Sequence, residues 1–150
     1  KRQLYITGRK KDVIITAGGE NVAPTPIELK IQSLIDNSGH VILIGDQRKY
    51  LTVLIAPAEG KPVPSAVDVE TGMKEYNATH AQSRAQRVQK AHVLEKPFDV
   101  SSGELTPTMK VKRSFVTEKF ATEIDTMYDP GAAPLVGYSS MNIGKLEAAI

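Results

Sequence analysis

The chain has 150 residues, which is enough for one domain with a sizeable core and too few for two ordinary domains. Its hydrophobic fraction of 41% and charged fraction of 24% are close to globular averages and argue against disorder and against a membrane-spanning segment. Nineteen basic and seventeen acidic residues give a net charge of +2, too balanced for the broad positive field of a non-specific nucleic-acid binder. The absence of cysteine excludes disulfides, thiolate catalysis and cysteine-ligated zinc, and it fits a reducing compartment.

The start of the sequence carries no signal-peptide pattern. It begins at Lys1 and enters the apolar stretch 4–6 within three residues. We therefore expect an excerpt from a longer polypeptide with a cytoplasmic location.

The first expected elements are two short extended pieces, 4–7 and 12–16, separated by the basic segment 8–11. Gly18 and Gly19 then predict a turn, because consecutive glycines permit positive φ and let another molecule approach the backbone closely.

A helix is expected next. Thr25 can act as its N-cap, Pro26 suits its first position, and Glu28 completes a capping box. The helix should end near 37–39 and bury one apolar face, formed by Ile27, Ile31, Leu34 and Ile35.

The middle of the chain predicts a sheet. The apolar runs 41–44 and 51–56 have strand length and form a reasonable hairpin. The segment 66–76 is compatible with a short helix, although its polar content leaves this open. A capping-box pattern and apolar residues at helical spacing predict a helix over 80–90.

The last third contains a possible short strand at 92–94 and a clear amphipathic helix at 113–128. Because a proline disfavours helix in the residue before it, Thr106 should be extended, which leaves Lys110 on a loop before that helix. Residues 129–150 predict a flexible tail. The fold class is therefore α+β, a small mixed sheet with flanking helices.

Motifs of metal, nucleotide and hydrolase sites are absent from the sequence. The three histidines have no ligand spacing, and no metal site is expected. GxSxG, GxxxxGK[ST] and GxGxxG do not occur. Two basic loops remain, 8–12 and 110–113, and on composition alone each is a solvated charge run.

Both basic loops lie in longer stretches that resemble one enzyme superfamily. GRKKDVIITAGGENVAPTPIE (8–28) resembles the hinge and following loop of adenylate-forming enzymes, and GELTPTMKVKR (103–113) resembles their C-terminal catalytic-lysine loop in its fatty-acyl form. The match is strongest to long-chain and very-long-chain fatty-acid–CoA ligases of the bubblegum type. Further counterparts are Gly45-Asp46, the strand from Tyr50 to Leu54, and Ser83–Gln86.

The resemblance implies that residues 1–128 form the small C-terminal lid of such a ligase, with its hinge near 8–12. The large N-terminal domain, which holds the ATP and acyl pockets, is absent from this chain. The fragment alone should be inactive. Its implied partners are that domain, a fatty acid, ATP with Mg²⁺, and coenzyme A; nucleic acid is not among them, and peripheral membrane association is possible.

The resemblance also implies roles for single residues. Lys110 matches the adenylation lysine, and Met109 stands where the family usually has glycine. Lys11 matches the hinge position and Arg9 the arginine that contacts the nucleotide. Gly18, Gly19 and Glu20 match the segment that borders the coenzyme A channel.

Two other interpretations stay open. The substrate could be a medium-chain or aromatic acid, because the acyl pocket lies outside this chain. Alternatively, the chain is a non-catalytic module that binds nucleic acid or anionic membrane through its basic residues Arg84, Arg87, Lys90, Lys110, Lys112 and Arg113.

Overall fold

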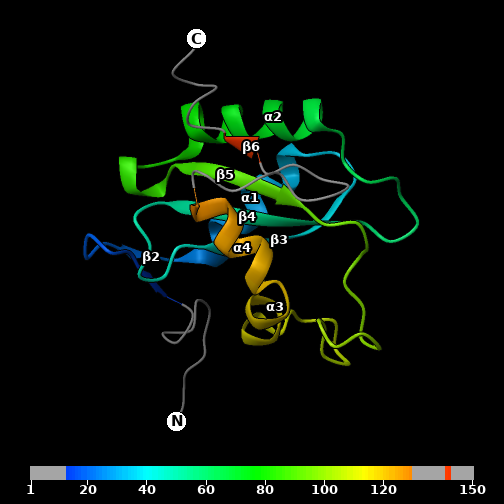
Figure 1. Cartoon of the computed structure of the whole chain (residues 1–150). Helices are drawn as coiled ribbons and strands as arrows, with labels where there is room; N and C mark the ends of the chain where they lie inside the picture. Colours follow the sequence, from blue (N-terminus) through cyan, green and yellow to red (C-terminus); the bar gives the residue numbers. More distant parts are fainter. Residues whose placement is uncertain (1–12, 130–140, 143–150) are drawn as a thin grey trace.

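The computed structural model describes residues 13–129 and 141–142 (Figure 1). Arg9, Lys11 and the expected hinge at 8–12 lie outside the described residues. Within the described part of the chain, no helix combines the length and apolar character needed to cross a membrane.

The centre of the molecule is a four-stranded mixed sheet in the order β3-β4-β5-β6. Strands β3 (Ser38–Ile44) and β4 (Leu51–Pro57) form the expected antiparallel hairpin. Strand β5 (Val88–Val93) runs parallel to β4, and the short β6 (Met141–Asn142) is antiparallel to β5. A separate two-stranded hairpin joins β1 (Ile14–Ile15) to β2 (Asn21–Val22).

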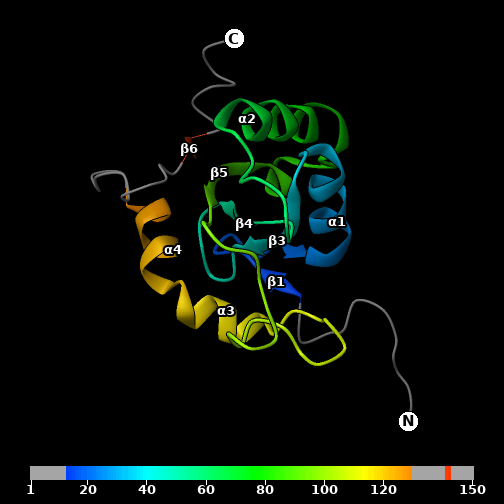
Figure 2. The same cartoon turned by 90° about the vertical axis from the view of Figure 1, so that its right-hand side faces the viewer.

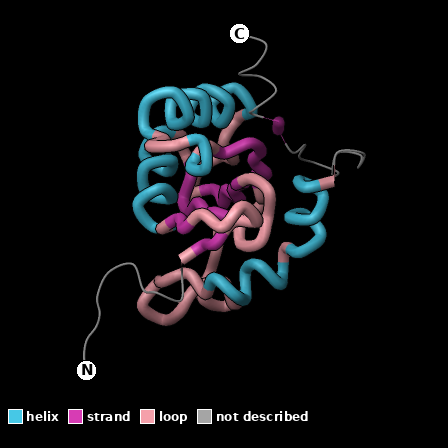
Figure 3. The backbone as a smooth tube through the Cα atoms, turned by 90° about the vertical axis from the view of Figure 1, so that its left-hand side faces the viewer, coloured by secondary structure: helices cyan, strands magenta, loops and turns pink. Residues whose placement is uncertain are grey.

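Helices cover both faces of this sheet. Helices α1 (Pro24–Leu34) and α2 (Ala66–Glu75) lie on one side, and α3 (Arg113–Lys119) and α4 (Ala121–Tyr128) lie on the other (Figure 2). In Figure 3 the strands run between these two groups of helices. The predicted α+β class with a mixed sheet and flanking helices is confirmed.

The central strands have continuous apolar runs because helices cover both faces of the sheet. Every residue of β4 is buried, as expected for a strand with both faces packed. In β3, Val41 and Leu43 join the core beneath α1 and α2, whereas Ile42 and Ile44 join the core beneath α3 and α4. Successive side chains of a strand point to opposite faces, so one strand supplies both cores.

Helix α1 begins at Pro24, earlier than the capping pattern predicts. Its N-cap residue is Ala23, which makes no side-chain cap bond, so the assignment of Thr25 as the cap was wrong. Pro24 occupies the first position, where the lack of an amide proton costs nothing. Glu28 is buried and takes part in a different contact, described below.

The predicted helix over 80–90 was wrong. A π-helical turn follows α2 at Tyr76–His80, a 3-10 turn spans Arg84–Gln86, and β5 begins at Val88. The amide of Asn77 fixes the start of the strand, since it accepts from the Val88 N–H and donates to the Val88 carbonyl, both at 2.9 Å.

The other expected elements differ at their boundaries. The segment left open at 66–76 is helix α2, capped by Ser65, whose hydroxyl accepts from the Asp68 amide at 3.1 Å. The helix expected over 113–128 is divided into α3 and α4 at Phe120. Met141–Asn142 form β6 inside the segment expected to be a tail; the rest of 130–150 lies outside the described residues.

Candidate functional site

Lys110 follows a three-residue hairpin loop. Leu105 and Val111 form an antiparallel bridge, and the Thr106 amide donates to the Lys110 carbonyl at 2.8 Å. The Met109 amide donates to the Thr106 carbonyl at 2.7 Å and closes a tight turn. The Lys110 side chain is exposed and makes no hydrogen bond or ion pair with any residue the structure describes. Its charge is therefore available to a ligand.

Met109 lies in the left-handed region with φ of 70°. A tight turn followed by a left-handed residue is a common three-residue hairpin loop, and glycine is the residue that adopts this conformation most easily. The family's usual glycine therefore has a conformational reason at this position. Met109 adopts this left-handed conformation at the cost of some backbone strain.

Two ion pairs connect the base of the lysine loop, residues 106–110, to the helices. The Arg113 guanidinium donates to both carboxylate oxygens of Glu28, at 2.6 and 2.9 Å, and Glu28 also accepts from the Leu43 amide at 2.7 Å. Lys119 pairs with the buried carboxylate of Glu104. These contacts fix both sides of the loop and leave its tip free.

The pKa of Glu104 is lowered in this environment. Burial alone would raise the pKa, but hydrogen bonds from Lys119, Ser102 and the Asp99 amide outweigh that effect. Glu104 is therefore a structural anion at neutral pH.

Gly18, Gly19 and Glu20 lie on the exposed loop between β1 and β2. The Gly19 amide donates to the Thr16 carbonyl at 2.9 Å, and the Thr16 amide donates to the Glu20 carbonyl at 3.0 Å. Gly19 has φ of 86°, and a Cβ built there would meet no atom within 4 Å. The outer side of this loop is open, so another molecule can contact its backbone directly.

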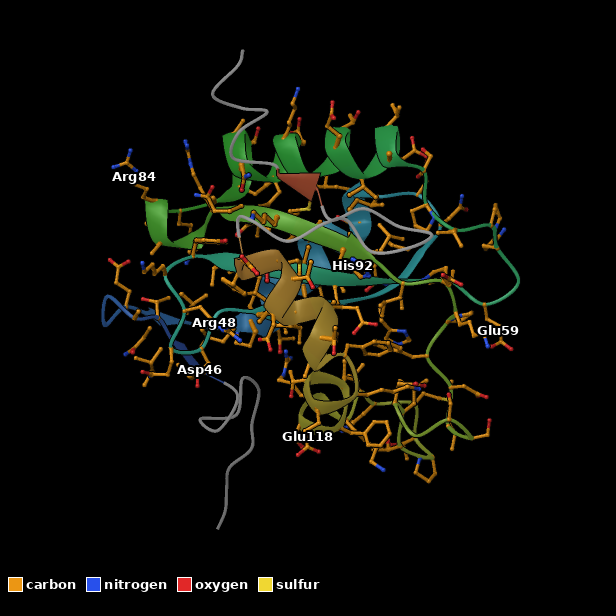
Figure 4. All side chains as sticks on the ribbon, in the orientation of Figure 1. Asp46, Arg48, Glu59, Arg84, His92 and Glu118 are labelled. Atoms are coloured by element: carbon orange, nitrogen blue, oxygen red, sulfur yellow. The ribbon has the colours of Figure 1, made fainter. Side chains whose placement is uncertain are left out.

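The residues next to this glycine loop hold it on the sheet. The Ile15 amide donates to the Asp46 carboxylate at 3.1 Å, and the Ala17 amide donates to the Arg48 carbonyl at 2.9 Å. Arg48 in turn pairs with Asp125 of α4 at 2.9 Å. Figure 4 shows Asp46 and Arg48 at the side of the molecule that carries the glycine loop.

The two loops lie apart on the molecule. In Figure 1 the glycine loop (blue) lies at the left edge, and the segment that leads through the lysine loop into α3 (yellow-green) lies at the lower right. The structure therefore does not bring Lys110 together with Gly18, Gly19 and Glu20.

One cavity is separate from both loop tips. It has a volume of about 560 Å³ and is lined by residues around the end of β5 and the start of α4, among them His92, Phe98, Glu104, Lys119 and Glu123. Burial lowers the pKa of His92, and the nearby Glu123 carboxylate offsets part of this effect. The described residues include no group of three or more His, Asp or Glu side chains that could hold a metal ion.

The basic residues of the alternative binding module do not form one patch. Arg84 lies at the upper left of Figure 4, far from the lysine loop at the lower right of Figure 1. Arg113 is paired with Glu28, and the Lys90 ammonium lies 5.9 Å from the centre of the Tyr50 ring. The arrangement of these residues does not support the alternative.

Residues 11–132 match a protein family described as the AMP-binding enzyme C-terminal domain. The chain belongs to this family. Its relatives include the long-chain-fatty-acid–CoA ligases ACSBG1 of Rattus norvegicus, at 38% identity, and ACSBG2 of Mus musculus, at 36% identity. Each alignment covers 83% of this chain, but only 22% and 24% of the relative. This AMP-binding C-terminal domain thus spans about a quarter or less of the length of those ligases.

Solved structures of adenylate-forming enzymes share the fold. The A domain of carboxylic acid reductase from Segniliparus rugosus, solved with AMP and a carboxylic acid, superposes with a TM-score of 0.66 at 19% identity. The superposition covers 80% of this chain and 20% of that one. At this identity the likeness concerns the fold of the C-terminal domain.

Proposed function

We propose that this chain is the closing domain of a long-chain fatty-acid–CoA ligase and that Lys110 is its adenylation lysine. In the first half-reaction the fatty-acid carboxylate attacks the α-phosphorus of ATP, pyrophosphate leaves, and an acyl-adenylate forms. In the second, the sulfur of coenzyme A attacks the acyl carbon, AMP leaves, and the thiol proton passes to solvent. The observation that carries the proposal is the exposed ammonium of Lys110, which makes no hydrogen bond or ion pair with any described residue, on a loop whose two sides are held in place.

Adenylation requires a cation because it brings two anions together. A carboxylate approaches a triphosphate, and negative charge accumulates on the oxygens around the α-phosphorus. A lysine supplies a compact charge with rotatable donors. Losing one such preorganised stabiliser typically costs about 3–4 kcal/mol, or a factor of about 10² to 10³ in rate.

The glycine loop would serve the second half-reaction. After rotation, Gly18 and Gly19 would border the channel for the pantetheine arm of coenzyme A, with Glu20 at its edge. The open space around Gly19 supports this role, because a thiol arm can pass along backbone that carries no side chain. Arg9 would contact the nucleotide and Lys11 would act as the hinge, where a few dihedrals absorb the rotation.

ATP and coenzyme A would be shared with the N-terminal domain of the same polypeptide. The described residues offer no acidic cluster for Mg²⁺, so the ion would be carried by the nucleotide phosphates and by groups outside this chain. A cytoplasmic location and peripheral membrane association stay predictions, which fractionation of cells that express the full-length protein would test.

Pyrophosphate exchange tests the proposal. The full-length protein is incubated with ATP, a long-chain fatty acid and labelled pyrophosphate, beside its Lys110→Ala and Lys112→Ala variants. Lys112 is an exposed lysine of the same segment and serves as the matched control. We expect exchange to fall about 10² to 10³-fold in Lys110→Ala and to stay within a few-fold of wild type in Lys112→Ala. Equal losses in the two variants, or no exchange by wild type with any carboxylic acid, would refute the proposal.

A further inference from the structure

The glycine loop and the lysine loop have the same internal bonding, although their sequences differ. Each begins with a threonine, Thr16 or Thr106, whose amide donates to the carbonyl four residues later. In each, the threonine carbonyl accepts from the amide three residues later. The residue before the last has positive φ in both, 86° at Gly19 and 70° at Met109.

The threonine hydroxyl adds one further bond in each loop. The Oγ1 of Thr106 accepts from the Lys110 amide at 3.1 Å, and the Oγ1 of Thr16 accepts from the Glu20 amide at 3.2 Å. In the lysine loop, Thr106 Oγ1 also lies 3.0 Å from Thr108 Oγ1. The hydroxyl therefore holds the backbone of the last residue of each loop, Lys110 or Glu20, in place.

We propose that Thr106 and Thr16 are positioning residues, each for one of the two half-reactions. The inference rests on the proposed function. Thr106 would set the direction of Lys110 for adenylation, and Thr16 would set the glycine loop for passage of the thiol arm. Neither threonine touches a substrate.

For the lysine loop, the reason is that few other contacts hold its tip. The Lys110 side chain makes no polar contact within the part of the chain that the structure describes, so the backbone bonds of the loop are what sets the point and direction from which it leaves the loop. Met109 precedes Lys110 in a conformation that methionine rarely adopts, and the hydroxyl bond opposes its relaxation. Small displacements of a catalytic group reduce rates strongly.

The test uses the full-length protein with Thr106→Val and Thr16→Val, which keep the side-chain shape and remove the hydroxyl. Pyrophosphate exchange reports adenylation, and thioester formation from supplied acyl-adenylate and coenzyme A reports the second half-reaction. We expect Thr106→Val to slow only exchange and Thr16→Val to slow only thioester formation, each by about tenfold, the effect of one hydrogen bond.

Two kinds of variant serve as controls. Thr106→Ser and Thr16→Ser keep the hydroxyl and should restore both rates to near wild type. Thr126→Val removes a hydroxyl bond inside α4, to the Thr122 carbonyl at 2.9 Å, and should change neither rate. A valine variant that slows both half-reactions equally, or neither, would overturn the inference.

Hydrogen exchange separates this inference from the proposed function. Mass spectrometry of peptides that cover each loop should show faster exchange in Thr106→Val only at 105–112 and in Thr16→Val only at 15–21. If amide hydrogen exchange of the loop peptides is unchanged in both valine variants, the positioning role is overturned, whatever the enzyme catalyses. A wild-type protein that performs neither half-reaction would instead refute the proposed function.

Discussion

The ion pair between Glu28 and Arg113 should be a major contributor to the stability of this domain. Glu28 is 8% exposed and accepts three hydrogen bonds, two from Arg113 and one from the Leu43 amide on the edge strand β3. One carboxylate thus joins α1, β3 and the start of α3. Glu28→Gln removes the carboxylate charge with which the Arg113 guanidinium pairs.

The magnitude follows from the burial of the two groups. Breaking a buried pair by removing one partner typically costs about 3–5 kcal/mol. The Arg113 side chain is 26% exposed, so water can recover part of that loss, and we expect the free energy of unfolding to fall by about 2–3 kcal/mol. Asp125→Asn is the matched control. Its pair with Arg48 has a similar length, 2.9 Å, but is exposed, and its loss should cost less than about 1 kcal/mol.

Urea denaturation of the chain measures both changes. If a variant shifts the urea midpoint and leaves the dependence of the unfolding free energy on urea concentration unchanged, only its stability has changed. The double variant Glu28→Gln/Arg113→Met should be more stable than the sum of the single effects predicts, since neither group is then left without its partner. A loss below about 1 kcal/mol in Glu28→Gln, or strict additivity, would refute the reasoning.

Two further predictions concern backbone strain and acid. Met109→Gly should leave the free energy of unfolding unchanged or raise it by up to about 1 kcal/mol, whereas Gly19→Ala should lower it by about 1 kcal/mol, because both positions are left-handed. The urea midpoints of the two variants test this prediction. A clear loss of stability in Met109→Gly would contradict it. Burial lowers the pKa of His92 in the folded state, so below about pH 6.5 the unfolded chain binds the proton first. Stability should therefore fall as pH drops from about 7 to 5, less steeply in His92→Gln; equal slopes would contradict the assignment.

Local patterns predicted the hairpin of β3 and β4 and the position of Lys110. The runs 41–44 and 51–56 are apolar because both faces of the sheet are covered, and that signal is visible in the sequence. Proline at 107 disfavours a helical conformation at Thr106, and this effect does not depend on distant contacts. Such features depend on residues that are near each other in the chain.

Non-local contacts caused the main errors. The segment 80–90 has helical spacing, but Val88 and Ala91 are fully buried because they belong to strand β5. This strand pairs in parallel with β4, whose residues come more than thirty positions earlier in the chain. Glu28 fits a capping box, yet its partner is Arg113, which follows it by 85 residues. A single sequence contains no local signal for either contact.

The candidate site was predicted in part. Lys110, Gly18, Gly19 and Glu20 lie on exposed loops, as expected, whereas Arg9 and Lys11 lie outside the described residues. The sequence gives no signal for the proposed roles of Thr16 and Thr106, since TAGGE and TPTMK share only their first residue. The equivalence of the two loops lies in their hydrogen bonds.

Separating the two half-reactions in the full-length Lys110→Ala variant tests the central claim most directly. Pyrophosphate exchange measures adenylation, and single-turnover formation of acyl-CoA from supplied acyl-adenylate measures the second step. We predict that exchange falls about 10² to 10³-fold while acyl-CoA formation stays within a few-fold of wild type. Equal losses in both half-reactions would contradict the assignment of Lys110 to adenylation.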